Sequence, residues 1–185
     1  MAGLVAIIGG RQLSPAAAAH VQALAAQLAG RGFTLVTGCC TGADQAVIAA
    51  ALVGTVPVEA LQVLAAFGPG GQGACPVSAV AAVEAFAAGG GAVSWWAGGG
   101  PGVPLRARLA GRAAQVINSA ASVVAMHPGR GSWRACRLAA ARGLPVVVFS
   151  ASPVSLGAGH WQPVCAGSLW SSAQRWMPRQ AAFSL

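Results

Sequence analysis

The sequence predicts an α/β protein with a doubly wound, mostly parallel sheet and helices on both faces. Short uninterrupted apolar runs, such as residues 4–8, are typical of strands covered on both faces. These runs alternate with helical segments up to about residue 150, which implies right-handed crossovers between parallel strands. The chain has 185 residues, of which 56% are hydrophobic, enough for one domain with a substantial core.

The first predicted elements have clear boundary signals. The strand at residues 4–8 ends at Gly9 and Gly10, and Ser14 then supplies a helix N-cap with Pro15 at the first helical position. This helix is expected to run to about Gly30 and to bury an apolar stripe of Val21, Leu24, Ala25 and Leu28. A strand at 33–37, a loop at 38–42 and a helix at 43–52, which Asp44 opens, are expected next.

The rest of the chain is less regular. Further elements are expected as a strand at 60–67, a loop at 68–73, a helix at 75–88, a strand at 92–96, a helix at 105–120, a strand at 122–126, a turn at 128–132, a helix at 133–142 and a strand at 145–149. Residues 1–150 are therefore predicted to form the domain. Residues 151–185 form a tryptophan-containing C-terminal extension that either packs back on the domain or supports a homo-oligomer; packing is favoured.

The charge balance favours an anionic partner. All 11 basic residues are arginine, only Asp44, Glu59 and Glu84 are acidic, and the net charge is +8. Arginine pairs bidentately with phosphate, so nucleic acid, a nucleotide or an anionic surface would suit. The alternative is a compositional bias in which the charge serves only solubility. Chemistry that needs two carboxylates or a catalytic lysine has almost no candidates.

Neither a membrane span nor a metal site is expected. The uncharged stretch 143–174 is interrupted by three prolines, and the start of the chain lacks the basic region of a secretion signal. The five cysteines show neither Cys-x-x-Cys nor Cys/His spacing, which indicates no zinc site and no disulfide framework. Cys39 and Cys40 are either small buried thiols, the favoured interpretation, or reactive ones. We expect a cytoplasmic protein without a metal or cofactor.

Three glycine loops each follow a predicted strand and precede a helix. They are Gly9-Gly10-Arg11, Gly38-Cys39-Cys40-Thr41-Gly42-Ala43-Asp44 and Pro128-Gly129-Arg130-Gly131-Ser132. All three should lie at the same edge of the sheet, where ligands of doubly wound sheets bind. Glycines allow close approach, helix N-termini attract anions, and the arginines and hydroxyls of these loops add donors. The loops predict a phosphate site, although glycine also serves such turns for purely steric reasons.

The arginines at 106, 108 and 112 of the predicted fourth helix do not share one helical face. We therefore expect scattered, solvated arginines there, with only Arg112 joining Arg11 and Arg130 at the glycine edge. His127 either reaches the ligand or is an ordinary edge residue. Trp133 either stacks on a base or packs in the core.

The order of these motifs resembles the SLOG/LOG superfamily of Rossmann-like domains over about residues 3–149. The resemblance is carried by Gly9-Gly10-Arg11-x-x-Ser14-Pro15, Thr37-Gly38-x-x-x-Gly42-Ala43-Asp44, Arg112 ahead of a Val-Val strand, Gly129-x-Gly131-Ser132 and Gly143-x-Pro145-Val146-Val147. It is closest to the DNA-processing protein A (DprA/Smf) type, with its GSR-x-x-S start, SG-x-x-x-GID loop and G-S-G-S-like turn.

The resemblance implies a Rossmann-like fold that binds nucleotides, nucleotide-derived signals or single-stranded DNA. By position, Gly9, Gly10 and Arg11 would face a phosphate, Gly42 and Asp44 would shape the second loop, and Arg112, Gly131 and Ser132 would close the site. Asp44 either caps its helix or orders a ribose or the loop. We hypothesise a protein that binds a phosphate-bearing ligand, a nucleotide or nucleotide derivative. Single-stranded DNA binding is the first alternative.

A nucleoside-monophosphate phosphoribohydrolase of the LOG type, with an atypical site, is the other alternative. LOG enzymes resemble this chain through PGG-x-GT-x-x-E, in which the glutamate takes part in catalysis. Ala135 occupies the equivalent position here. Binding rather than catalysis is therefore the expected activity.

Overall fold

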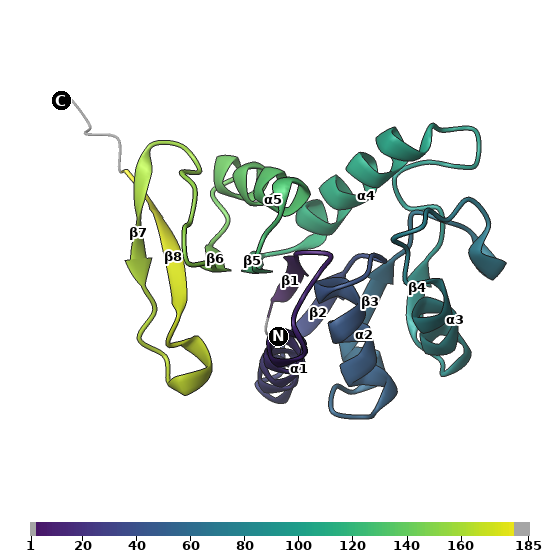
Figure 1. Cartoon of the computed structure of the whole chain (residues 1–185), viewed down its shortest axis with the longest axis horizontal. Coiled ribbons are helices and arrows are strands. Elements are labelled where there is room, and N and C mark those ends of the chain that lie inside the picture. Colours follow the sequence, from purple (N-terminus) through teal and green to yellow (C-terminus); the bar gives the residue numbers. More distant parts are fainter. Residues whose placement is uncertain (1–2, 180–185) are drawn as a thin grey trace.

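The computed structural model describes residues 3–179 and contains one eight-stranded sheet (Figure 1). The strands are β1 Leu4–Gly9, β2 Thr34–Thr37, β3 Leu61–Leu64, β4 Ala92–Ser94, β5 Ser122–Met126, β6 Val146–Phe149, β7 Gly159–Pro163 and β8 Ala173–Pro178. Their order is β4-β3-β2-β1-β5-β6-β8-β7. The first six run parallel, whereas β8 is antiparallel to both β6 and β7. The predicted doubly wound, mostly parallel sheet is confirmed.

Five α-helices cover the two faces of the sheet, as predicted (Figure 1). They are α1 Pro15–Gly30, α2 Ala43–Leu52, α3 Val80–Ala88, α4 Leu105–Ser119 and α5 Arg130–Ala141. One apolar core joins α1, α2 and α3 to the sheet, and a second core joins α4 and α5 to the opposite face. The chain crosses from one face to the other between α3 and α4, and α4 leads back to β5, which lies beside β1. The strand order therefore reverses between β1 and β5. This reversal is the usual place for a ligand in a doubly wound sheet.

The first helix forms as its sequence predicts. The Ser14 side chain accepts a hydrogen bond from the Ala17 N–H at 3.2 Å, and Pro15 begins the helix with a φ angle suited to it. The whole predicted stripe is buried against the sheet, from Val21 to Leu28. Burying each of its larger side chains stabilises the fold by about 1.5–3 kcal/mol, so α1 is held mainly by packing.

Two helix starts differ from the prediction. Helix α5 begins at Arg130 rather than at residue 133, so most of the predicted turn is the first turn of the helix. Helix α3 begins at Val80 rather than at residue 75. The segment between is a turn in which the Cys75 N–H donates to Ser78 Oγ at 3.1 Å. A local side-chain acceptor of this kind competes with helical hydrogen bonding.

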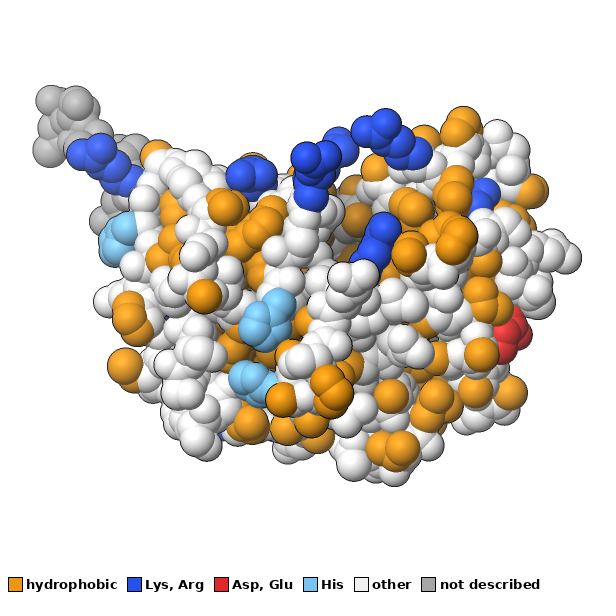
Figure 2. All heavy atoms as spheres, viewed as in Figure 1, with side chains coloured by type: hydrophobic (Ala, Val, Ile, Leu, Met, Phe, Trp, Pro, Cys, Tyr) orange, Lys and Arg blue, Asp and Glu red, His pale blue; other side chains and the backbone are white. Residues whose placement is uncertain are grey.

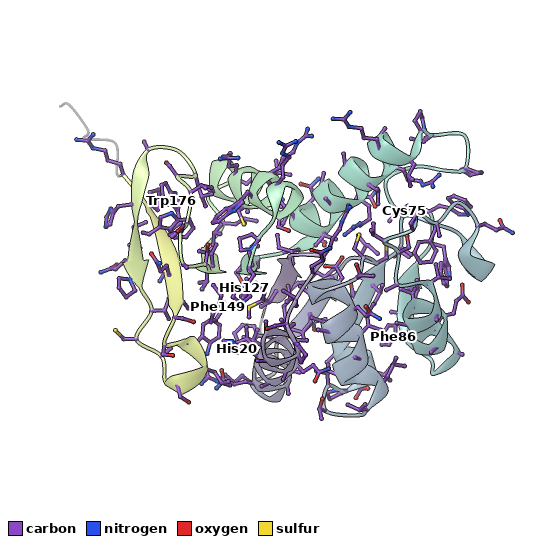
Figure 3. All side chains as sticks on the ribbon, in the orientation of Figure 1. His20, Cys75, Phe86, His127, Phe149 and Trp176 are labelled. Carbon is purple, nitrogen blue, oxygen red and sulfur yellow. The ribbon has the colours of Figure 1, made fainter. Side chains whose placement is uncertain are left out.

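The C-terminal extension continues the sheet as far as the structure describes it. Strand β8 pairs with β6, and a 3-10 turn at Ser168–Trp170 packs on α1, where the Trp170 indole donates to Gln27 Oε1 at 2.7 Å. On the other face, Trp161 contacts Trp176 and Trp133 edge to face, with ring centroids 5.1 and 6.3 Å away. Figure 3 labels Trp176, which lies on β8. These contacts show the extension packing back on the domain.

Within residues 3–179, no helix is long and apolar enough to cross a membrane.

Candidate ligand-binding cleft

A cleft of about 820 Å³ lies where β1 ends, between α4 and α5. It therefore occupies the point at which the strand order reverses, the place expected for a ligand. Six arginines line it: Arg11, Arg106, Arg112, Arg130, Arg134 and Arg137. Figure 2 shows arginine side chains along the upper rim of the molecule, over the two helices that border the cleft.

Seven of the thirteen predicted site residues line this cleft: Gly9, Arg11, Asp44, Arg112, Arg130, Gly131 and Ser132. Because β2, β1 and β5 are parallel neighbours, the three loops that follow them do share one edge of the sheet, as predicted. The other six, Gly10, Gly38, Thr41, Gly42, Pro128 and Gly129, lie outside the cleft lining. Thr41 and Gly42 border a shallower hollow of about 480 Å³, on which Arg11 also lies.

Two of the glycines pack backbone against backbone. The Gly10 N–H donates to Met126 O at 2.9 Å, and the Ala43 N–H donates to Gly10 O at 3.0 Å. Gly42 has a φ of +78°, and a Cβ there would collide with Gly10 O and with the backbone of Arg11. Gly10 and Gly42 therefore have a steric role in this packing. These contacts fix the first two loops to each other and to β5.

Both predicted hydroxyl donors bind the backbone. Ser132 Oγ donates to Gly9 O at 2.6 Å and joins the first turn of α5 to the end of β1. Thr41 Oγ1 donates to Arg11 O at 3.2 Å. Their hydrogen atoms are committed to these carbonyls, so the two hydroxyls set the loop positions.

A buried ion pair forms the floor of the cleft. Arg112 Nη1 donates to Asp44 Oδ2 at 3.4 Å, and the two residues are only 7% and 6% exposed. The Cys40 N–H also donates to Asp44 Oδ2, at 3.1 Å, so the carboxylate orders the second glycine loop. Burial raises the pKa of Asp44, against the opposing effects of Arg112 and of that N–H. Gly38 makes room for the pair, since a Cβ there would overlap both side chains.

Arg112 keeps hydrogen-bonding capacity beyond the ion pair. Its Nη2 donates to Cys40 Sγ at 3.1 Å, and its buried Nε has no hydrogen-bond partner among the described residues. A buried donor without a partner carries a desolvation cost, and an anion in the cleft is one group that would offset it.

The expectation of scattered, solvated arginines on α4 was wrong for Arg108, which is buried, whereas Arg112 lines the cleft at the glycine edge, where it was expected. Arg108 and Arg112 are buried, and their i, i+4 spacing places them on the same face of α4. Arg108 donates to Gly73 O and lies over the Trp96 ring at 5.0 Å, so it holds the loop after β3. Arg106 is exposed at the cleft rim.

The structure adds Arg134 and Arg137 to the predicted residues. Together with Arg130 they have i, i+4, i+7 spacing, which puts all three on one face of α5, beside the cleft. That spacing was the signal in the sequence that could have found them. The N-cap residue of α5 is Gly129, whose lack of a side chain leaves the first N–H groups of the helix without a side-chain acceptor.

His127 and Trp133 do not line the cleft. His127 is exposed at the end of β5 with a φ of +44°, a left-handed conformation that is rare outside glycine. Trp133 contacts Trp161 from the extension, so the packing alternative is the one observed.

Fold and cleft together define a Rossmann-like α/β protein with an arginine-lined cleft where its strand order reverses. The model of the family described as DNA recombination-mediator protein A matches residues 2–163, and the chain belongs to this family. A comparison with curated proteins found no match.

Solved structures share the fold. DNA processing protein A from Helicobacter pylori, described with its mode of binding single-stranded DNA, has a TM-score of 0.61 and 22% identity over 83% of this chain. DNA processing protein A from Streptococcus pneumoniae has a TM-score of 0.61 and 20% identity over 84%. The chain spans 66% and 53% of the lengths of these two proteins. The molybdenum cofactor carrier protein of Chlamydomonas reinhardtii has a TM-score of 0.54 and 18% identity, covering 83% of this chain and 80% of its own.

Proposed function

We propose that the chain binds single-stranded DNA in the cleft between α4 and α5. The observation that carries this proposal is the charge of the lining: six arginines against a single carboxylate, Asp44, which is already paired with Arg112. Five of those arginines are exposed. A single phosphate needs fewer donors than these, whereas successive phosphates of a strand would use donors spread along two helices.

The wall of the cleft favours a single strand over a duplex. Between the arginines the lining is apolar, with Leu109 and Ala113 on α4 facing Leu138 on α5. An unpaired base can place its flat face against such a wall, whereas the bases of a duplex are already stacked and paired. The description of the Helicobacter pylori relative as a single-stranded DNA binder supports the same choice.

A nucleotide or nucleotide derivative is the second candidate. The cleft volume of about 820 Å³ lies within the range of roughly 300–1,000 Å³ that is usual for small-molecule sites. The first turn of α5 offers free N–H groups of the kind that bind a terminal phosphate. The hydrolase alternative has less support, because the buried Ala135 lines the cleft where LOG enzymes have their glutamate.

Fluorescence anisotropy with a labelled oligothymidylate tests the proposal. We expect binding that weakens steeply with salt, because phosphate contacts release counterions, and weaker binding of the same length of duplex. Arg130→Ala should lower the affinity, while Arg31→Ala should leave it unchanged. Arg31 is a matched control because it is exposed and follows α1, at the edge of the sheet opposite the cleft.

Competition separates the two candidates. If unlabelled thymidine monophosphate displaces the labelled oligonucleotide at concentrations similar to those at which unlabelled oligonucleotide displaces it, the site is one for nucleotides. If Arg130→Ala and Arg31→Ala behave alike, the cleft is not the binding site and the proposal is wrong.

Assembly into a homo-oligomer through the C-terminal extension also stays a prediction. Strand β7 is one of the two edge strands of the described sheet and pairs only with β8 there. Light scattering on the protein as it elutes from a size-exclusion column would give its mass and show whether it is a monomer or a homo-oligomer.

A further inference from the structure

A second hollow, of about 480 Å³, shares Arg11 with the cleft. Three glutamines line it: Gln12 in the loop before α1, Gln22 on α1 and Gln45 on α2. We call it the glutamine hollow. Within its described lining Arg11 is the sole charged residue, whereas six arginines line the cleft. The phosphate contacts proposed for the cleft use none of these glutamines.

Two neighbouring helices bring the glutamines together. Helices α1 and α2 lie side by side and pack against each other (Figure 1). Ala18 and Gln22 share one face of α1, and Gln45 and Ala49 share one face of α2, because residues four positions apart are neighbours on a helix. The short alanine side chains do not fill the space between the helices. A hollow with a partly apolar lining therefore remains between the amides.

The glutamine amides keep their hydrogen-bonding capacity. Gln12 and Gln45 are exposed and Gln22 is half-buried, and no hydrogen bond joins these amides to any other group of residues 3–179. The amide of Gln27 on α1 differs, because its Oε1 accepts a hydrogen bond from the Trp170 indole at 2.7 Å. A glutamine amide is flat and has both donors and an acceptor. It therefore pairs with a planar edge that has donors and acceptors side by side, as a nucleobase has.

Arg11 connects the glutamine hollow to the cleft, since it lines both. Its backbone is held in place, because Thr41 Oγ1 donates to Arg11 O at 3.2 Å and Gly42 packs against the Arg11 backbone. The exposed guanidinium has five N–H donors, which suit a phosphate. A phosphate on Arg11 would therefore lie at the boundary between the two cavities.

We propose that the glutamine hollow binds one base of a single-stranded DNA whose adjacent phosphate is held by Arg11. The amides hydrogen-bond the edge of the base, and the alanines of the two helices contact its face. This inference rests on the proposed function, because the strand must also occupy the cleft. It adds hydrogen bonds to a base edge, which the arginines and the apolar wall of the cleft do not supply.

The charges of the two cavities suit different parts of a nucleotide. A phosphate is an anion, so it gains most in the cleft with its six arginines. A base is uncharged and polar at its edge, so neutral amides suit it better than charged side chains do. In a duplex the pairing edge is already occupied by the other strand, so only an unpaired base offers that edge to the amides.

Anisotropy with two labelled oligomers of equal length tests this inference. One is oligothymidylate, and the other is an abasic oligomer with the same number of deoxyribose phosphates. Gln45→Ala should weaken the binding of oligothymidylate by about three- to tenfold, the effect of one neutral hydrogen bond, and leave the binding of the abasic oligomer unchanged. Arg130→Ala should weaken both, because it removes a phosphate contact. A uniformly abasic oligomer gives the same answer wherever the strand is placed along the site.

Gln115→Ala is the matched control. Gln115 is an exposed glutamine on α4 that lines neither cavity, so this variant should bind both oligomers as the unsubstituted protein does. Because Gln45 is also exposed, Gln45→Ala should unfold at the same urea concentration as the control. A loss of affinity with unchanged unfolding is then due to a lost contact.

The outcomes separate this inference from the proposed function. If Gln45→Ala and Gln115→Ala bind oligothymidylate equally well, or if Gln45→Ala weakens both oligomers to the same extent, no base occupies the hollow and the inference is wrong, while strand binding in the cleft stands. If the unsubstituted protein binds neither oligomer, the proposed function fails and the base site fails with it.

Discussion

Arg112 on α4 donates a hydrogen bond to Asp44 on α2 across 3.4 Å, although 68 positions separate them in the chain. Helices α2 and α4 cover opposite faces of the sheet. The ion pair between Arg112 and Asp44 therefore connects the two helical layers at the edge of the sheet. The Asp44 carboxylate also accepts a hydrogen bond from the N–H of Cys40, in the second glycine loop. This ion pair therefore has both a structural role and a place in the floor of the cleft.

Breaking the pair from one side should destabilise the protein strongly. We expect Asp44→Ala to lower the free energy of unfolding by about 3–5 kcal/mol, because it leaves the buried Arg112 charge uncompensated. The double variant Asp44→Ala/Arg112→Leu should lose much less than the sum of the two single variants, as measured by urea unfolding. Strictly additive losses would show that the two side chains do not interact.

Gly42 should tolerate no side chain. Gly42→Ala is expected to cost about 2–4 kcal/mol of unfolding free energy, from the positive φ together with overlap with Gly10 O. Gly54→Ala is the matched control, since Gly54 has a φ of +76° and its added methyl group would meet nothing within 4 Å. The difference between the two variants in urea unfolding measures the overlap alone, and equal costs would contradict it.

The arginines of α5 should act through phosphates. Arg134→Ala and Arg137→Ala should each weaken oligothymidylate binding and reduce the slope of log affinity against log salt by about 0.7, the value for one phosphate on a single strand. The slope is measured by anisotropy over a salt series. A variant that weakens binding with an unchanged slope would have acted through packing instead.

The stability of the protein should depend on Cys39 as pH changes. The fold lowers the pKa of Cys39 from 9.0 to about 7, so it stabilises the thiolate. This contribution is fully present above pH 9.0 and is lost as the pH falls through about 7. Between about pH 6.5 and 9 the unfolding free energy should rise by about 1–3 kcal/mol relative to that of Cys39→Ser. Parallel pH profiles for the two proteins would contradict the lowered pKa.

The C-terminal extension should be needed for stability. Trp176→Ala removes a buried ring that contacts Trp161, and we expect a loss of about 3–5 kcal/mol in thermal or urea unfolding. His160→Ala is the control, because His160 is exposed on the adjacent strand β7. Similar stabilities for the two variants would show that the contact between Trp176 and Trp161 contributes little to the free energy of unfolding.

Local sequence signals predicted most of the fold. Ser14 and Pro15 marked the start of α1, and the run at residues 122–126 gave β5 with its observed bounds. Errors arose where a weak local signal was taken as a boundary. Helix α5 begins three positions before residue 133, because Gly131 and Ser132 were assigned to a turn although they form the first turn of the helix.

The candidate site was predicted in part. The edge of the sheet was correct because parallel strands place their carboxyl ends together, and Arg11, Arg112 and Arg130 do line one cleft. The hydrogen bonds of Thr41 and Ser132 could not be predicted, because their acceptors are carbonyls of Arg11 and Gly9, which come close only after folding.

The sequence by itself determined the alternation of strands and helices, the glycine loops at one edge and the excess of arginine, since each depends on residues near one another in the chain. The tertiary structure decided which charges are buried. Asp44, Cys40 and Arg112 meet because β1 lies between β2 and β5, so that α2 and α4 reach the same edge of the sheet from opposite faces. The environment of a charge depends on such long-range packing, which local sequence patterns do not encode.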